Sequence, residues 1–142
     1  MPKHNEREAV MAYSRPTEYR RMSDTELMQR VLVVLNHKRK WCQGSNALNA
    51  SGLPVSPLSD EAVSWCLRGA CIKVLNPDHS VLVRELHEER SEISMQIARA
   101  CGFDTPSKGV QWNDTQGRTW VDVVERVQRR VSESASRKEK SK

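Results

Sequence analysis

The stretch DEAVSWCLRGACIKVL, residues 60–75, decides the fold that we expect. Ala62, Cys66, Ala70 and Val74 recur within it at every fourth position, which is the spacing of one face of an α-helix. Ser59 directly precedes the stretch as a candidate N-cap, and acidic residues occupy its first turn, where they suit the helix dipole. The sequence therefore predicts a helix over residues 60–75.

Upstream of this stretch, a capping signal predicts another helix. In the sequence SDTE, residues 23–26, Ser23 can cap a helix and Glu26 can reach back to the Ser23 amide, which makes a capping box. Apolar residues at three- and four-residue steps follow, so we expect a helix over residues 24–38. Residues 41–59 are rich in glycine and proline, and they predict an irregular connection with at most a short turn.

Two more helices are expected downstream. The third and longest is predicted from residue 78 or 80 to residue 101, and Gly102 supplies its C-terminal stop. Residues 103–118 are interpreted as a loop in which GVQW could form a short extended piece. Thr119 and Asp122 then form a weaker capping box for the last helix.

The sequence thus predicts an all-α fold: a compact single domain of about four helices with long ordered loops and flexible charged termini. With 142 residues the chain is long enough to bury a core without disulfides or a metal. We expect a partly ordered N-terminal arm over residues 1–22, a helical domain over residues 23–131 and a disordered basic tail over residues 132–142. The tail is too polar to fold by burial.

The net charge of +5 is concentrated at the two ends of the chain. Residues 1–22 carry +2 and residues 129–142 carry +4, which leaves −1 for residues 23–128. The basic ends therefore predict a weak electrostatic contact with nucleic acid. No apolar run approaches the roughly 20 residues that span a bilayer, and the N-terminus does not resemble a secretory signal. We expect a cytoplasmic protein without a membrane partner.

Four cysteines, Cys42, Cys66, Cys71 and Cys101, are expected to be reduced in that compartment. Cys66 lies about two turns inside the predicted helix, on a stripe of small residues, so packing is the favoured interpretation and a nucleophile is disfavoured. Cys42 is the better chemical candidate because it lies in a loop. The spacings match no structural zinc pattern, so we expect no metal.

Gly69 interrupts the predicted helix, where glycine is unfavourable by about 1 kcal/mol relative to alanine. We therefore expect another segment to press against the backbone at Gly69, and a tryptophan ring is the natural candidate.

Among the stretches of this sequence, QWNDTQGRT, residues 111–119, has the composition that fits a purely packing role least well. One interpretation is a structured helix entrance in which a tryptophan is buried and the polar side chains bond to the backbone. The other is one wall of a pocket, in which polar groups orient a ligand and two tryptophans supply flat apolar surface. The candidate ligand-binding or partner-binding residues are Trp41, Gln43, Trp112, Asn113, Asp114 and Arg118.

A resemblance follows from four motifs in order: WCQG, GLPVSP, DEAVSWCLRGA and WNDTQGRTWVDVVERV. Together they resemble an uncharacterised family of small bacterial and bacteriophage proteins, a domain of unknown function, over residues 27–131. The resemblance implies a compact, mainly helical domain with a phage or mobile-element origin, and it offers no reaction. It also implies that the residues of its motifs assemble as one unit. These are Trp41, Gly44, Trp65, Cys66, Gly69, Ala70, Trp112, Asn113, Asp114, Gly117, Arg118 and Thr119.

The familiar catalytic motifs are missing from the sequence. The leading hypothesis is a non-enzymatic helical accessory protein that binds a macromolecular partner, either a host protein or nucleic acid, in the cytoplasm and without a cofactor. The alternative is a small enzyme or ligand-binding domain with a polar pocket on the loop that contains Trp112, Asn113 and Asp114. A DNA-reading helix-turn-helix is disfavoured, because acidic residues would stand at the end of the second helix that meets DNA.

Overall fold

A computed structural model of the chain describes residues 22–76 and 91–141, with side chains described as far as residue 134. Five α-helices and two short strands make up this part of the chain. The helices are α2 (Asp24–Val34), α3 (Leu67–Leu75), α5 (Glu92–Cys101), α6 (Pro106–Asp114) and α7 (Trp120–Ser141); the strands are β1 (Ala47–Asn49) and β2 (Ala62–Trp65); a 3-10 turn, η2, spans Lys38–Lys40. The fold is therefore mostly helical, and the expectation of a purely α fold is wrong because a small antiparallel sheet is present.

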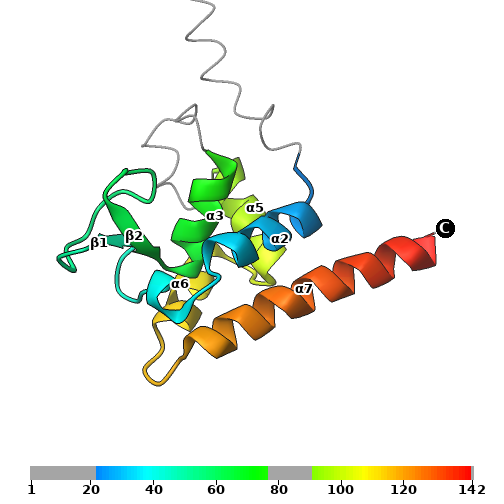
Figure 1. Ribbon diagram of the computed structural model, residues 1–142. Helices are drawn as coiled ribbons and strands as arrows, with labels where there is room; N and C mark the ends of the chain where they lie inside the picture. The colour runs from blue at the N-terminus through cyan, green and yellow to red at the C-terminus, as the bar shows by residue number, and fades with distance from the viewer. Residues whose placement is uncertain (1–21, 77–90, 142) are drawn as a thin grey trace, which may run out of the picture.

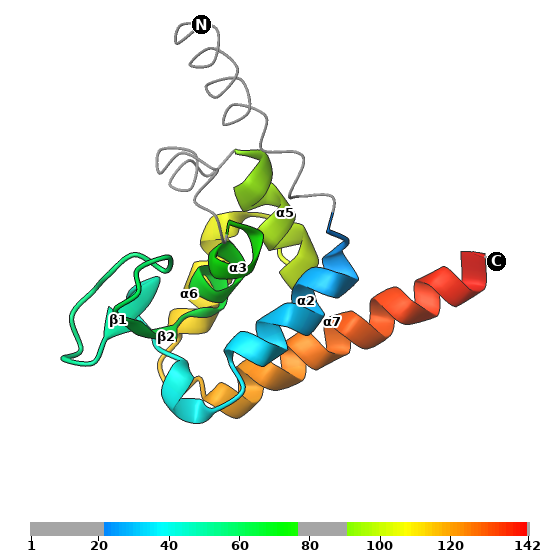
Figure 2. The same cartoon turned by 45° about the horizontal axis from the view of Figure 1, so that its top comes forward.

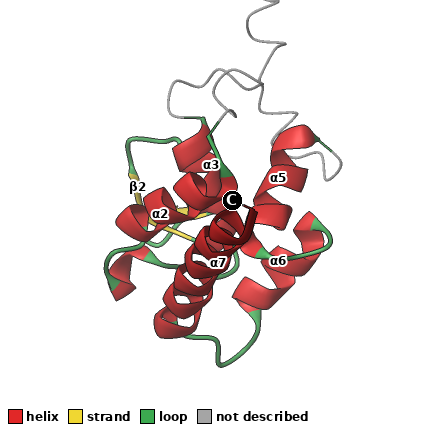
Figure 3. Cartoon of the chain, turned by 90° about the vertical axis from the view of Figure 1, so that its right-hand side faces the viewer, coloured by secondary structure: helices red, strands yellow, loops and turns green. Residues whose placement is uncertain are grey.

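The first and last of the described helices lie side by side. In Figures 1 and 2, α2 and α7 run in opposite directions along one side of the molecule, and this pair makes the most extensive contact between elements. The indole Nε1 of Trp120, at the start of α7, donates to the Leu35 carbonyl at the end of α2 (2.8 Å). Viewed along α7, the helices α2, α3, α5 and α6 surround one side of it (Figure 3). None of the described helices has the length and apolarity needed to cross a bilayer.

The core between these helices is aliphatic, as the scarcity of aromatic residues suggests. Each helix except α6 contributes large apolar side chains that are fully or almost fully buried. They include Leu27, Met28 and Val31 of α2, Ile72 and Leu75 of α3, Ile93 and Ile97 of α5, and Val123 and Val127 of α7.

The stretch at 60–75 is not one helix, because its first half is β2 and only its second half is α3. The backbone of Trp65 accepts from the Cys42 amide (3.1 Å), and the Cys66 amide donates to the Asn46 carbonyl (3.2 Å). These long-range bonds engage backbone groups that a continuous helix would have used internally. Helix α3 then begins at Leu67, and Cys66 is its N-cap, with its thiol accepting from the Gly69 amide (3.2 Å).

Two expectations change with this helix boundary. Cys66 lies at the N-terminus of a helix and not two turns inside one. Asp60 and Glu61 lie in the turn before β2, so they form no acidic first turn of a helix and give no reason to disfavour a DNA-reading helix.

The backbone of another segment lies very close to α3 at Gly69. A Cβ at this position would lie only 1.8 Å from the carbonyl oxygen of Asn46. The expected close approach is confirmed, but the neighbour is a backbone carbonyl of the turn before β1 and not a tryptophan ring. Glycine is required at this position because any side chain would collide with that turn.

The helix boundaries agree with the capping signals where these are local. Ser23 caps α2 by accepting from the Glu26 amide (3.0 Å), although α2 ends at Val34, four residues earlier than expected. Gly102, with φ 86°, ends α5 as predicted. Helix α5 begins after Ser91, and the predicted start at residue 78 or 80 lies outside the described residues.

The segment 103–118 differs from the expected loop, because α6 occupies its middle and the predicted extended piece GVQW is helical. Thr105 caps α6, and Pro106 takes its first position, where a missing amide hydrogen is harmless. The capping box of α7 is confirmed, since Thr119 and Asp122 exchange amide-to-side-chain bonds of 2.9 and 3.2 Å. Helix α7 continues to Ser141, whereas the sequence predicts a disordered tail from residue 132.

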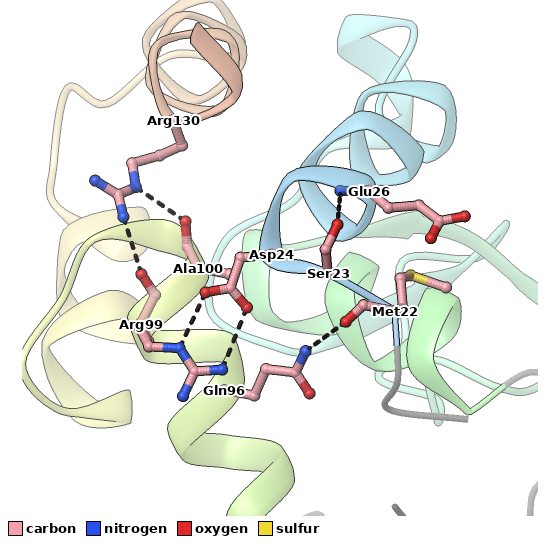
Figure 4. Close-up of polar contacts among 8 residues, drawn as sticks. All are labelled: Met22, Ser23, Asp24, Glu26, Gln96, Arg99, Ala100 and Arg130. Carbon is pink, nitrogen blue, oxygen red and sulfur yellow. Dashed lines mark hydrogen bonds and ion pairs between the residues drawn. The ribbon is translucent and has the colours of Figure 1, made fainter. Parts of the chain in front are cut away.

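Two arginines of α7 hold the C-terminal end of α5. The last carbonyls of a helix have no partner within it, and they carry the negative end of the helix dipole. Arg130 donates to the carbonyls of Ala100 (3.0 Å) and Arg99 (3.1 Å), as Figure 4 shows, and Arg126 donates to those of Cys101 (2.9 Å) and Gly102 (3.1 Å). Four consecutive carbonyls are thus satisfied from a neighbouring helix.

The N-terminal end of α2 is tied to α5 by a second set of polar contacts, also drawn in Figure 4. The Arg99 guanidinium pairs with Asp24 (2.9 Å), and the Gln96 side chain donates to the Met22 carbonyl (3.2 Å). Arg99 is two-thirds exposed, so this ion pair adds little stability by itself.

Candidate functional site

Asn113 lies at the centre of the candidate residues, near the C-terminal end of α6. Its side chain is 1 % exposed. The Oδ1 atom accepts from Trp41 Nε1 (2.8 Å) and from the Leu67 amide (3.0 Å), and the Nδ2 atom donates to the Cys42 carbonyl (3.2 Å) and to Asp114 Oδ1 (2.9 Å). One amide therefore joins α6 to the first residue of α3 and to the turn before β1.

The turn around Gln43 and Gly44 is bound to the same end of α6. Gln43 Nε2 donates to the carbonyls of Asn113 (2.9 Å) and Thr115 (3.1 Å), and the Gly44 amide donates to Asp114 Oδ1 (3.0 Å). Gly44 has φ 83°, a conformation that glycine adopts without strain. Asp114 is exposed, but its carboxylate is engaged by the backbone of this turn and by the side chain of Asn113.

Trp112 and Arg118 belong to a second cluster, on a different set of partners. The Arg118 guanidinium lies 4.1 Å from the centre of the Trp112 ring, and its Nε donates to the Trp112 carbonyl (2.9 Å). Arg126 also faces this ring at 4.9 Å, and it faces the Phe103 ring at 4.0 Å. Phe103 and Trp112 are tilted neighbours, with 5.8 Å between ring centres. The two arginines thus cover the aromatic surface that a pocket would have offered.

These contacts favour the structural interpretation of the loop over the pocket. Trp41, Gln43, Asn113 and Asp114 are brought together as a hydrogen-bonded joint, while Trp112 and Arg118 form a cation–π stack. A pocket between α3, α5 and α6 has a different lining, which is mainly apolar and includes none of the six candidates. It has room for about one water molecule, about 10 Å³.

The four thiols are all buried. Burial raises the pKa of Cys66 to about 12, even though its sulfur caps the N-terminus of α3, and burial also raises the pKa of Cys42. The hydrogen bond with Cys101, followed by burial, raises the pKa of Cys71 well above its usual value. Because a thiolate is the nucleophilic form, Cys42, Cys66 and Cys71 react slowly at neutral pH unless an electrophile is held directly against the sulfur. Within the described ranges, no three His, Cys, Asp or Glu side chains are arranged to hold a metal ion.

Comparison with known proteins gives one match. The family model described as "Family of unknown function (DUF6197)" matches residues 20–130. The chain belongs to this family. No curated protein and no solved structure matches it. The joint around Asn113 and the stack on Trp112 lie within the DUF6197 region, and so do the starts of all five described helices.

Sequence reasoning missed three features of this DUF6197 chain. The first is the carbonyl of Asn46, which contacts both Gly69 and the Cys66 amide. The second is the pair of α7 arginines at the end of α5, and the third is the contact between Cys71 and Cys101. The unfavourable glycine within a helical pattern did indicate a close neighbour. The other two features depend on tertiary packing that no local spacing reveals.

Proposed function

We propose that the chain is a non-enzymatic accessory protein that binds an acidic macromolecule, nucleic acid in the first instance, through the end of the molecule that carries η2. What supports this is the distribution of charge on that end. Lys38, Arg39 and Lys40 are consecutive and exposed, and none of them forms an ion pair within the described part of the chain. A cluster of free cations attracts a phosphate backbone.

The surroundings of η2 add exposed apolar surface to this charge. Val33 on the last turn of α2 is 68 % exposed, and Val121 on the first turn of α7 is 50 % exposed. The two helix ends lie together, since Trp120 bonds to Leu35, and Figures 1 and 2 place η2 beside the first turn of α7. Exposed cations and exposed apolar side chains thus occur at the same end of the molecule, a combination suited to a partner.

The alternative, an enzyme or ligand-binding domain on the Trp112–Asp114 loop, has less support. Asn113 is buried with its amide fully engaged, and the Asp114 carboxylate is bound by the turn at Gly44. A ligand would have to displace bonds that hold α3 and α6 together. The bacterial or bacteriophage origin of the family, with the cytoplasm of the host as the compartment, is also part of this proposal and rests on the resemblance of the motifs.

The test is a charge reversal that is matched for net charge. In the test variant Lys38, Arg39 and Lys40 become Glu; in the control variant Arg30, Lys108 and Arg129, which are exposed but spread over three helices, become Glu. Binding to a short fluorescent DNA duplex is measured over a series of salt concentrations. The slope of log K against log salt should fall in magnitude by about 0.9 for each DNA phosphate that the variant no longer neutralises.

We expect the test variant to lose most of its affinity at low salt and the control variant to keep most of it. Deletion of residues 132–142 should reduce the slope further, because these residues include four basic side chains. Equal losses of DNA affinity in the two triple variants would show that only net charge matters, and they would overturn the assignment of the binding surface to η2. No measurable binding by the unaltered protein at low salt would overturn nucleic acid as the partner.

A further inference from the structure

Cys71 and Cys101 form a buried thiol pair between two helices. Cys71 of α3 is 0 % exposed and Cys101, the last residue of α5, is 3 % exposed. Their sulfur atoms are 3.9 Å apart, and either thiol can donate to the other. Each sulfur is thus a direct neighbour of the other, and a disulfide would require the two sulfurs to approach to about 2.05 Å.

The pocket between α3, α5 and α6 leads to one member of this pair. Cys101 contributes to its lining and Cys71 does not. Three of its lining residues, Phe103, Gly109 and Val110, are only half-buried, which indicates that solvent reaches the pocket on their side. Its volume of about 10 Å³ admits about one molecule of the size of water, which is close to the size of hydrogen peroxide.

The remaining two thiols are differently engaged. The Cys42 thiol donates to the Ser45 carbonyl (3.6 Å), and the Cys66 sulfur accepts from the Gly69 amide while its thiol faces Asn46 Oδ1 (3.7 Å). Both therefore serve the turn before β1 and the N-terminus of α3. Among the four cysteines, the contact between two sulfurs belongs to Cys71 and Cys101.

We propose that Cys71 and Cys101 are a redox pair, which a peroxide oxidises to an intramolecular disulfide that joins α3 to α5. In the first step the Cys101 sulfur attacks a peroxide oxygen, the O–O bond breaks, and the leaving hydroxide takes the thiol proton to form water; Cys101 becomes a sulfenic acid. In the second step the Cys71 sulfur attacks the Cys101 sulfur, the S–O bond breaks, and the leaving hydroxide takes the Cys71 proton. Two thiols and one hydrogen peroxide thus give one disulfide and two waters.

Arg68 is placed to assist the second step. It lines the same pocket, and its positive charge partly offsets the rise in the pKa of Cys71 that the hydrogen bond with Cys101 and burial produce. Because the thiolate is the attacking form, this charge favours attack on the oxidised Cys101. A thiol-based reductant reverses the reaction by exchange with the disulfide.

The disulfide would close a chain loop between residues 71 and 101 and would therefore restrict the unfolded chain. A loop of this length predicts a melting temperature for the oxidised protein that is higher by on the order of 10 °C than for the reduced protein. Cross-linking α3 to α5 would also fix the two helices on either side of the pocket. This proposal does not depend on the proposed function, since it concerns a buried pair of thiols and not the exposed cations of η2.

The experiment treats the full chain with hydrogen peroxide under native conditions, alkylates the remaining thiols and maps cross-linked peptides by mass spectrometry. We expect a cross-link between Cys71 and Cys101, with loss of two hydrogens, that a dithiol reductant removes. The control variant Cys42→Ser, Cys66→Ser should form the same cross-link, because serine at 66 can still cap α3.

The order of the steps is tested with dimedone, a reagent that traps sulfenic acids. In Cys71→Ser, unfolding the protein in dimedone after the peroxide has been removed should label Cys101, since no resolving thiol remains to consume the sulfenic acid. Label on Cys71 in Cys101→Ser at an equal rate would overturn the assigned order. A Cys42–Cys66 cross-link, or oxidation that occurs only after the protein is unfolded, would overturn the proposal itself. Both of these outcomes are measured on the unaltered chain, so they do not depend on whether a variant folds.

Discussion

Replacing Asn113 by Ala should destabilise the protein far more than an average surface substitution. The change removes four hydrogen bonds made by one buried amide. Two of them, from the Leu67 amide and to the Cys42 carbonyl, lie in buried surroundings, so each partner would lose its bond without gaining water. A buried group left without a partner is unfavourable by about 1–3 kcal/mol. Trp41 Nε1, which also loses its acceptor, adds a smaller penalty. We therefore expect the free energy of unfolding to fall by about 3–5 kcal/mol.

The assay is urea unfolding followed by tryptophan fluorescence and circular dichroism, with the m value compared between proteins. Asn49→Ala is the matched control. Asn49 also accepts two backbone amides through Oδ1, from Ser51 (2.9 Å) and Leu53 (3.0 Å), but both bonds are exposed. Its loss should be about 1 kcal/mol or less, because water can replace the side chain. If Asn113→Ala lost no more than Asn49→Ala, the role of Asn113 as the joint between α3 and α6 would be refuted.

Asn113→Asp sharpens this test, because it keeps the shape of the side chain. The new carboxylate would still accept from Trp41 and Leu67, but its second oxygen would face the Cys42 carbonyl and Asp114, where Nδ2 now donates. We expect strong destabilisation at neutral pH. The difference in free energy of unfolding between Asn113→Asp and the unaltered protein should become smaller as the pH falls, since a protonated carboxyl group can donate a hydrogen bond. A difference that is constant with pH would contradict the donor role.

Three further predictions concern Gly69, Arg130 and Cys66. Gly69→Ala should destabilise the protein by about 3 kcal/mol or more, because the new methyl group would overlap the Asn46 carbonyl. Gly109→Ala should lower the free energy of unfolding much less, since the nearest atom to its new methyl group is a side-chain ring atom at 3.2 Å. Thermal unfolding of both variants checks this difference. Arg130→Met keeps the apolar stem but removes the two bonds to the end of α5, and hydrogen exchange of the last turn of α5 should accelerate while that of α3 stays unchanged. Burial raises the pKa of Cys66 to about 12, so the thiol ionises at lower pH in the unfolded chain than in the folded protein. The free energy of unfolding should therefore fall as the pH rises from about 9 to about 12. Cys66→Ser should make this fall smaller when denaturation is measured at a series of pH values.

The parts of the fold that follow from the sequence are those in which signal and structure lie within a few residues of each other. The capping of α2 by Ser23, the capping box of α7 and the stop at Gly102 are contacts between near neighbours in the chain. Their residue types do the same in most proteins, so the patterns predict them.

The parts that could not be predicted are decided by distant segments. Residues 60–65 have a helical pattern, yet their backbone pairs with residues 41–49, and this pairing makes Cys66 the capping residue of a shorter helix. Helix α6 begins at a local signal, Thr105 followed by Pro106, but glycine and asparagine lower its intrinsic propensity, and its C-terminal end is held by the turn at Gln43. In both regions tertiary contacts override the local preference.

The six candidate residues assemble in two clusters and not in one unit, because Trp112 and Arg118 pair with each other, apart from the other four. Trp41, Gln43, Asn113 and Asp114 do meet, although about seventy residues separate the two segments. The sequence could not decide between ligand binding and architecture, because an amide such as Asn113 serves either purpose. Its burial and its four internal partners favour architecture.

The packing of α2 against α7 has a consequence for how the protein is made. Helix α2 is made before α7, and the helix with which it makes its most extensive contact starts only at Trp120. The carbonyls at the end of α5 likewise have no side-chain donors from α7 until Arg126 and Arg130 have been made. A nascent chain arrested before α7 would therefore display unburied leucine and methionine from α2, and chaperones should bind this arrested chain in preference to the finished product.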